Sequence, residues 1–198
     1  MWSWYSGTGR LASTMVTNNQ IVLFPVDLRY GWDLNDPDTF RMLMQIDEQV
    51  KPQCVTMEPR CKYWSIAGRT RAPEKTRYER NKEKQMLQRL VDFTLYLNHH
   101  SRLVCIENPA SSALWTESPL ASLKQSSLEY VIFAQCAHSD KPDGQRHLKE
   151  TILCTNFPME NTALECTCKH GHIPLRSKLT APAAAFSPNM CLAIVKDI

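Results

Sequence analysis

The sequence predicts an α/β fold in which helices cover both faces of a mainly parallel sheet. Short apolar stretches alternate with longer stretches whose apolar residues have helical spacing, in the rhythm strand, helix, strand, helix. The length of 198 residues and the apolar content of 43% fit one globular domain or a domain with a small appendage. No run approaches the roughly 18 apolar residues that a membrane-spanning helix needs, so we expect no membrane partner.

Three strands and three helices are expected in the N-terminal half. Asp36 and Pro37 have the residue types typical of an N-cap and of a first helical position. A long helix is predicted further on because Met86, Leu90 and Phe93 repeat at helical spacing. The expected segments are strands over 2–5, 21–24 and 53–57, and helices over 10–18, 37–50 and 73–98.

The C-terminal half is expected to add three strands and then to become irregular. The strands are predicted over 103–106, 129–134 and 150–155, and the residues beyond them are rich in Pro and Ala. We expect residues 1–156 to form the core, with a Cys- and His-rich region over 157–198 that completes the same domain.

Residues with distinct chemistry follow four of the expected strands. Because ligands bind beyond the carboxyl ends of the strands in open α/β sheets, these residues are expected to meet at one edge. A single polar residue at a strand end is routine, whereas four such ends are less so. The residues are Gly7 and Gly9, Asp27, Cys61, and Glu107 with Asn108.

Each of these positions also has a purely structural alternative. The turn Ser6–Gly9 either connects a strand to a helix or lets a cofactor approach the backbone at a helix N-terminus. Asp27 has the position of a carboxylate that binds ribose hydroxyls. Asp33 either contacts an adenine or caps a turn.

Cys61 and Glu107 are the candidate catalytic residues. Arg60 and Lys62 flank Cys61, and adjacent cations lower the pKa of a thiol and favour the nucleophilic thiolate. Glu107 ends a buried strand, where a desolvated carboxyl stays protonated and can donate to a ring nitrogen of a base. The alternatives are an exposed cysteine without a role, and a carboxyl that caps a helix or forms an ion pair.

The net charge of +3 is concentrated in one segment. Residues 69–89 contain eight basic and three acidic residues, so the rest of the chain is close to neutral. Such a segment is either a solvated helix face or a contact for a polyanion such as nucleic acid. The candidate nucleic-acid-binding residues are Arg69, Arg71, Arg77 and Arg80.

The placement of the cysteines favours an intracellular, reduced protein over a secreted one. Cys54, Cys105 and Cys154 lie in apolar runs, where a thiol behaves as a small core residue. No signal peptide is visible at Met1–Tyr5. A secreted disulfide framework is therefore not expected.

A group of cysteines and histidines forms a candidate metal site. Alternating residues of an extended segment point to the same side, so Cys168, His170 and His172 present three ligands there. Cys136 or Cys166 supplies the fourth, and a structural zinc ion is the expected metal. The alternative is a loop that becomes ordered on nucleic acid.

Several short motifs follow one another in a characteristic order. They are Ser6–Gly9, Asp27, Asp33–Leu34, Glu58–Ser65, Ile106–Pro109, Gln135–Cys136, Lys149–Thr151, Thr155–Asn156, Cys168–His172 and Ala185–Pro188. This order resembles that of the cytosine-C5 DNA methyltransferases, which use S-adenosyl-L-methionine (AdoMet), and most closely their compact branch associated with phages and retroelements. The sequence departs from the family at Arg60, where the family has a second proline, and at Lys62, where classical members carry glutamine.

The resemblance implies a Rossmann-like class I methyltransferase fold and AdoMet-dependent methylation of cytosine in DNA, with RNA as an open alternative. Cys61 would attack C6 of the base, and Glu107 would bind the base at N3 and at its exocyclic amine. Asn108 would belong to the same base site, and Lys149 would support the loop or a phosphate. The implied cofactor site consists of Ser6, Gly7, Gly9, Asp27, Asp33 and Pro59.

A second hypothesis stays open beside the enzyme. In it the chain keeps the methyltransferase fold without catalysis and serves as a nucleic-acid-binding or assembly module of a phage or mobile-element protein. The two hypotheses differ most directly in whether the protein binds AdoMet.

Overall fold

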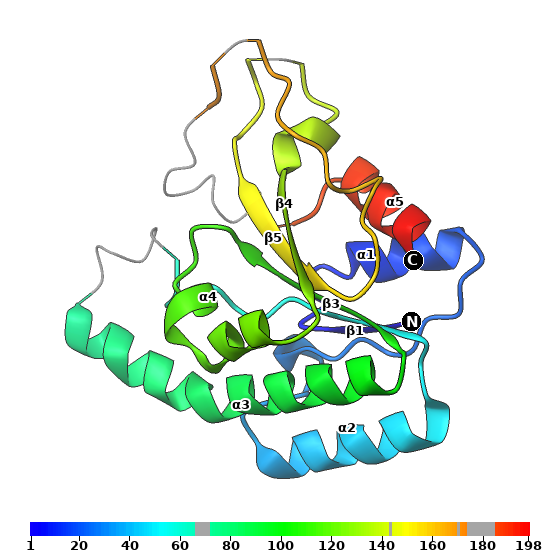
Figure 1. The fold of residues 1–198 in the computed structure, drawn as a ribbon, viewed down its shortest axis with the longest axis vertical. Helices are drawn as coiled ribbons and strands as arrows, with labels where there is room; N and C mark the ends of the chain where they lie inside the picture. Colours follow the sequence, from blue (N-terminus) through cyan, green and yellow to red (C-terminus); the bar gives the residue numbers. More distant parts are fainter. Residues whose placement is uncertain (66–71, 143, 170, 174–184) are drawn as a thin grey trace.

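A five-stranded sheet lies between two layers of helices in the computed structural model, which describes residues 1–65, 72–142, 144–169, 171–173 and 185–198 (Figure 1). The strand order is β1-β2-β3-β5-β4. The first three strands are parallel, whereas β5 is antiparallel to both of its neighbours. The strands are β1 (Trp2–Trp4), β2 (Cys54–Met57), β3 (Leu103–Pro109), β4 (Glu129–Ala134) and β5 (Glu150–Thr155).

Helices α2 and α3 cover one face of the sheet, and α1 and α5 lie together on the other (Figure 1). Helix α2 begins as its sequence predicts, because the Asp36 carboxylate accepts hydrogen bonds from the N–H groups of Asp38 and Thr39. The helices are α1 (Arg10–Thr17), α2 (Pro37–Val50), α3 (Pro73–His99), α4 (Leu114–Glu117) and α5 (Pro188–Asp197), with 3₁₀ segments η1 (Leu28–Tyr30), η3 (Pro119–Gln125) and η4 (Gln135–His138).

The alternation of side chains along the strands separates two apolar cores. Val104 and Ile106 of β3 belong to the core under α2 and α3, whereas Cys105 between them belongs to the core under α1 and α5. Trp4 stacks on Phe93 of α3, with ring centroids 4.8 Å apart. The central strands are thus buried on both faces, which fixes the positions of their carboxyl ends.

The structure differs from the sequence prediction in three places. Residues 21–24 form no strand: Ile21 is 85% exposed, and the segment is joined to the N-terminus and β1 by isolated hydrogen bonds, such as that from the Leu23 N–H to the Met1 carbonyl, and by the bridge between Val26 and Trp4. Helix α5 lies in the region expected to be irregular, where Ser187 is its N-cap and Pro188 its first residue. The prediction of a mainly parallel sheet holds for β1 to β3 only, because β5 reverses direction.

The helices carry no candidate membrane span. None of the helices in the described part of the chain is long and apolar enough to cross a membrane. Most of the buried residues of the long helix α3 are apolar and pack against the sheet, including Leu87, Leu90 and Leu97, whereas Tyr78, Leu95 and Tyr96 are exposed.

Candidate functional site

The carboxyl ends of β1, β2 and β3 lie at one edge of the sheet. After β1 the chain passes through α1 and returns to Val26, which pairs with Trp4 on the side of β1 away from β2. The connection that follows β2 runs through α3 to β3, which lies on the side of β2 away from β1. The two connections therefore lead to opposite sides of the β1–β2 pair. Such a change of direction opens a crevice at the carboxyl edge, where open α/β sheets bind ligands.

A cavity of about 510 Å³ lies at this edge, and the carboxylates of Asp27 and Asp33 line it. Asp27 accepts hydrogen bonds from the N–H of Gly7 at 3.1 Å and from the N–H of Arg29 at 3.0 Å. Asp33 Oδ1 accepts from the backbone N–H and from the side-chain amide of Asn35, each at 3.0 Å. Both carboxylates are therefore held in place at the cavity wall.

A second cavity of about 210 Å³ adjoins the first and is lined by the turn Ser6–Gly9 through Ser6, Gly7 and Thr8. The two cavities share Glu58 and Arg29. Gly7 and Gly9 have φ angles of 51° and 69°, a left-handed conformation that favours glycine. The buried hydroxyl of Ser6 has no hydrogen-bond partner among the described residues, so it can pair with a ligand.

The loop that follows β2 carries Cys61 and is tied to the end of β3. The side-chain amide of Asn108 donates a hydrogen bond to the carbonyl of Pro59 at 2.7 Å. The carbonyl of Cys61 accepts from the N–H groups of Trp64 and Ser65 at 2.9 and 2.8 Å, and its side chain is half-buried. These bonds hold the Cys61 loop beside the end of β3.

Arg60, which precedes Cys61 in the sequence, pairs with the buried carboxylate of Glu83. Its guanidinium donates to Glu83 Oε1 at 3.1 Å, and the indole N–H of Trp64 donates to Glu83 Oε2 at 2.7 Å. Glu83 therefore offsets part of the cationic charge that the sequence places next to the thiol. Trp64 is 1% exposed, so it packs in the core and offers no stacking surface for a base.

Glu107 and Lys149 form an ion pair at the end of β3, with 3.7 Å between Oε1 and Nζ. Burial raises the pKa of Glu107 above its usual range, although the Lys149 ammonium acts in the opposite direction. Glu107 Oε1 and Asn108 Oδ1 are buried without a hydrogen-bond partner in the part of the chain that is described. Buried polar atoms that lack a hydrogen bond are costly unless a ligand supplies one, so this is a candidate site for a polar ligand.

Glu58 is a functional candidate to which the sequence analysis gives no role of its own. It follows the last residue of β2, and it lines both cavities. Burial, together with the Glu107 carboxyl, raises the pKa of Glu58 to about 8, while Lys149 lowers it. The signal in the sequence is a carboxyl at a strand end, the same signal that singles out Asp27 and Glu107.

The structure brings most of the expected site residues to one edge of the sheet. The two cavities collect the glycine turn, Asp27 and Asp33, and the Asn108 hydrogen bond holds the Cys61 loop next to them. No family model and no curated protein matches this chain. The functional argument therefore depends on the geometry of this edge.

The expected nucleic-acid contact is described in part, because Arg69 and Arg71 lie outside the described residues. Arg80 forms an ion pair with Glu117, and its Nε donates to the carbonyl of Tyr63 at 2.7 Å. The Arg80 side chain is 25% exposed and is therefore largely engaged in packing the Cys61 loop on α3.

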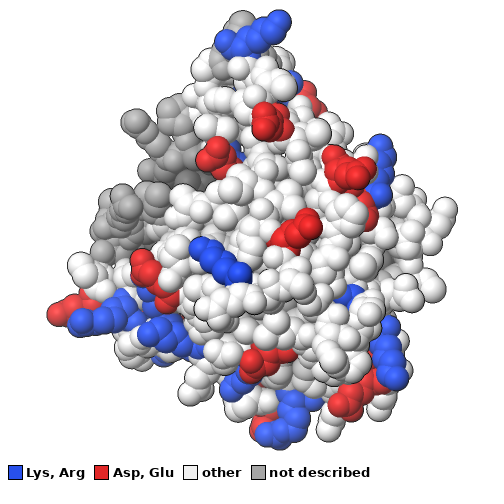
Figure 2. All heavy atoms as spheres, in the orientation of Figure 1, with Lys and Arg blue, Asp and Glu red and all other residues white. Residues whose placement is uncertain are grey.

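Arg77 and Lys84 line a cavity of about 470 Å³ beside the Cys61 loop. Figure 2 shows Lys and Arg side chains interspersed with Asp and Glu on one face of the molecule, with no large surface of one sign. Of the six described basic residues of this segment, three line the cavity near Cys61, namely Arg77, Arg80 and Lys84.

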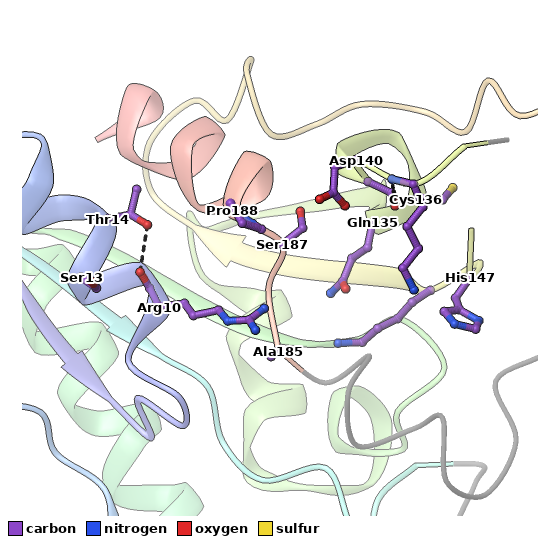
Figure 3. Close-up of a pocket in the computed structure, with 13 residues that line it drawn as sticks. Arg10, Ser13, Thr14, Gln135, Cys136, Asp140, His147, Ala185, Ser187 and Pro188 are labelled. Atoms are coloured by element: carbon purple, nitrogen blue, oxygen red, sulfur yellow. Dashed lines mark hydrogen bonds between the residues drawn. The ribbon is translucent and has the colours of Figure 1, made fainter. Parts of the chain in front are cut away.

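A polar cavity of about 550 Å³ lies between α1, η4 and the start of α5 (Figure 3). Arg10 from α1 and Gln135 from η4 extend toward the same space. Arg10 also donates to the carbonyl of Phe186 at 2.9 Å, which ties α1 to the chain before α5. Lys149 and Cys136 line this cavity as well, so it joins the Glu107 site to the cysteine cluster.

Four metal-ligating side chains meet at η4. The Sγ atoms of Cys136, Cys166 and Cys168 and a ring nitrogen of His172 all lie within 4.8 Å of one another. This Cys₃His group can hold a metal ion. His170, an expected ligand, lies outside the described residues, and Cys166 joins the other three side chains.

The surroundings of the Cys₃His group favour anionic thiolates once a metal is bound. The Arg146 guanidinium lies 3.9 Å from Cys168 Sγ and donates to the carbonyl of Cys136 at 3.5 Å. Without a metal, burial and the adjacent thiols of Cys166 and Cys168 raise the pKa of Cys136 to about 12. A cation among the thiols would reverse that effect.

Proposed function

We propose that this protein is an AdoMet-dependent methyltransferase of the Rossmann-like class I fold that methylates C5 of cytosine in DNA. The hydrogen bond between Asn108 and Pro59 carries the proposal, because it holds the Cys61 loop beside the buried Glu107. A nucleophile, a carboxyl that binds the base and an adjoining cofactor cavity are the three parts that this reaction needs.

The two adjoining cavities fit the order of groups along AdoMet. Asp27 and Asp33 in the larger cavity suit the ribose and the adenine, and the turn at Gly7 suits the amino-acid end, where Arg10 offers a cation to the carboxylate. The unpaired hydroxyl of Ser6 supplies a further polar contact at that end. Taken together, the two cavities of about 510 and 210 Å³ are in the range of small-molecule sites. When bound, AdoMet supplies an electrophilic methyl group.

The residues around Cys61 and Glu107 have complementary roles toward the base. The Cys61 thiolate would add to C6, which opens the C5–C6 double bond and makes C5 nucleophilic. After methylation, loss of the C5 proton to solvent would expel the thiolate and restore the double bond. Glu107, whose pKa burial raises, would donate to N3 in its protonated form and accept from the exocyclic amine, and the Lys149 ammonium lies beside it. A cytosine in a duplex has to leave the base stack to reach Cys61 and the buried Glu107.

DNA is the proposed partner because cations lie beside the Cys61 loop. Arg77 and Lys84 line the adjoining cavity, whereas Arg80 is engaged with Glu117. Contacts of Arg77 and Lys84 with phosphates would make DNA binding depend on salt concentration.

Calorimetry with AdoMet, followed by a methylation assay, tests the proposal. We expect the wild type to bind AdoMet and to methylate cytosine in DNA. Cys61→Ala should still bind AdoMet but lose methylation by roughly 10³-fold or more, because no covalent adduct forms. Cys54→Ala, at a buried position in β2, is the matched control and should retain activity.

Two outcomes would overturn this assignment. If AdoMet does not bind at high micromolar concentration, the enzyme is refuted and the non-catalytic nucleic-acid-binding module takes its place. If Cys61→Ala still methylates DNA, Cys61 is not the nucleophile, and an amino group of a base is the acceptor instead.

We also propose that the ion held by the Cys₃His group is zinc. Three thiolates and one imidazole are a ligand set of structural zinc sites, and soft thiolates disfavour calcium and magnesium. Cys136 belongs to η4, whereas Cys166, Cys168 and His172 come from the chain after β5. A zinc ion would therefore link two segments that are distant in the sequence.

Metal analysis of protein purified without chelator tests the zinc proposal. We expect about one equivalent of zinc in the wild type, and less than about a tenth in Cys168→Ser and His172→Ala. Cys61→Ser, outside the cluster, is the control that should retain zinc. Loss of zinc in His170→Ala but not in Cys166→Ser would replace the described ligand set by one that contains His170.

A further inference from the structure

Glu58 occupies the junction of the two cavities at the carboxyl edge. Its N–H donates to the carbonyl of Trp4 at 3.1 Å, which fixes the backbone where β2 ends beside β1. One cavity contains Asp27 and Asp33, the other contains the glycine turn, and Glu58 lines both. A ligand that extends through both cavities must pass this carboxyl.

The charges around Glu58 come from several elements. Glu107 of β3 and Asp27 oppose its ionisation, and Lys149 before β5 favours it, so that the pKa of Glu58 is about 8, with burial as the largest cause. Arg29, the other residue common to both cavities, has a side chain that is 56% exposed and lies 3.8 Å from Asp27. The other charged groups that line the two cavities are Arg10, Asp33, Arg60 and Glu83, of which Arg60 and Glu83 pair with each other.

AdoMet and its product differ in charge at one atom. AdoMet has a sulfonium cation between its adenosine and amino-acid parts, and S-adenosylhomocysteine has a neutral thioether there. If the adenosine lies beside Asp27 and Asp33 and the amino-acid part beside Gly7, this sulfur falls at the junction, next to Glu58. A carboxylate at that point stabilises the cation and gives the thioether no comparable interaction.

We propose, on the basis of the methyltransferase function above, that Glu58 is the residue that distinguishes the cationic cofactor from the neutral product. The carboxyl ionises when AdoMet binds and takes up a proton again once the sulfur is neutral. Product release is thereby favoured, because the product lacks the interaction that holds the cofactor.

The sign of the pH dependence follows from the protonated state of free Glu58. A carboxyl with a pKa of about 8 must lose its proton to pair with the sulfonium, so AdoMet binding becomes tighter as the pH rises toward and through 8. Between pH 6.5 and 8.5 this gain amounts to roughly 20-fold if the bound carboxyl stays ionised. S-adenosylhomocysteine binding lacks this gain.

Calorimetry of both ligands with the wild type and with Glu58→Gln tests the proposal. In the wild type near pH 7.5, AdoMet binding should release a proton, seen as an enthalpy that depends on the ionisation enthalpy of the buffer. Glu58→Gln should lack this proton release and bind the two ligands with nearly equal affinity. Any dependence of its binding enthalpy on the buffer then comes from the amino group of the ligand. The matched control is Asp33→Asn, which removes a charge from the far end of the same cavity and should weaken both ligands alike.

The outcomes separate this proposal from the function on which it rests. If both ligands bind but the affinity ratio and the proton release are the same in Glu58→Gln as in the wild type, Glu58 is not the discriminating residue and the methyltransferase function stands. If neither ligand binds to the wild type, both proposals fail. Retained S-adenosylhomocysteine binding shows that Glu58→Gln is folded.

Discussion

The cavities at the carboxyl edge and the Cys₃His group are held in place by different forces. At the edge, β2 and β3 lie between two apolar cores, and Val55, Val104 and Ile106 are fully buried. Around the cluster, residues 163–167 are all exposed, and a few polar contacts connect this segment to the sheet, such as that from the Ala134 N–H to the Leu164 carbonyl.

This difference shows what each site requires before its ligand arrives. Apolar packing positions the edge without a ligand, as a site that must orient two substrates requires. A segment with little apolar burial gains its order from the ligand bonds themselves, so metal binding and local folding become one event. The comparison therefore predicts that the two regions respond differently to the same perturbations.

Metal removal is the largest expected effect, and it should be confined to one region. With a chelator, we expect exchange of the Ile173 amide, which donates to the Arg146 carbonyl at 2.9 Å, to accelerate by roughly 100-fold or more. The Ala134 amide at the end of β4 should behave likewise. Amide hydrogen exchange with mass spectrometry or NMR measures both.

The central strands supply the internal control for metal removal. Amides of the central strands, such as that of Val104, which donates to Asn156 Oδ1 at 2.9 Å, should keep their protection because both faces of these strands stay buried. Equal acceleration in both regions would show that the ion stabilises the whole fold. No change in either region would show that the cluster is ordered by its polar contacts alone.

Asp47→Ala should have the opposite pattern, with a large loss of global stability and retention of the metal. Asp47 is 1% exposed and forms two hydrogen bonds of 2.6 Å with the Arg102 guanidinium, which also donates to the Pro52 carbonyl. Removal of one partner leaves a buried cation unpaired, so the free energy of unfolding should fall by about 3–5 kcal/mol. Urea denaturation measures the loss.

Asp38→Ala is the matched control for Asp47→Ala. Asp38 pairs with Arg41 on the same helix, but the two side chains are exposed and the pair should contribute little. If the free energy of unfolding falls by a similar amount in the two variants, the buried pair of Asp47 and Arg102 does not stabilise the packing of α2 on the chain before β3. Loss of zinc from Asp47→Ala would show that the two regions are coupled.

The fold could be predicted from the sequence where local and tertiary signals agree. Helix α2 begins at Pro37 as predicted because the cap, the proline and the apolar spacing all point to one start. Residues 21–24 have the composition of a strand, yet Ile21 faces solvent and the segment forms no continuous ladder of backbone hydrogen bonds with β1. The reversed β5 could not be predicted, because strand order depends on contacts distant in the sequence.

The candidate site could be predicted as a set of strand ends, but not as a set of contacts. Asp27 follows an apolar stretch, and that signal suffices to place it at the edge although residues 21–24 form no strand, whereas the hydrogen bond from Asn108 to Pro59 joins residues 49 apart. Glu58 lacks a role at the sequence level because its importance comes from the two cavities it separates. The sequence offers Cys136 or Cys166 as the fourth metal ligand, and the structure places both thiols in the group, because the chain after β5 passes beside η4.

Ser187→Ala, at the boundary between the two regions, should have the smallest effect. The Ser187 hydroxyl accepts from the Met190 N–H at 3.2 Å and donates to the His138 carbonyl in η4 at 2.8 Å. Its removal should lower the free energy of unfolding by about 1 kcal/mol, the contribution of an N-cap. The loss should be no larger, because Met190 and Ile194 still pack on Leu11 in the core under α1.

Denaturation of Ser187→Ala beside Ser122→Ala gives the decisive comparison. The exposed Ser122 hydroxyl donates within η3 to the Pro119 carbonyl, so its loss should leave stability nearly unchanged. A loss above about 3 kcal/mol in Ser187→Ala would exceed any N-cap contribution. Helix α5 would then be held by its contact with η4 instead of by apolar packing. It would therefore belong to the Cys₃His region and not to the region held by apolar packing.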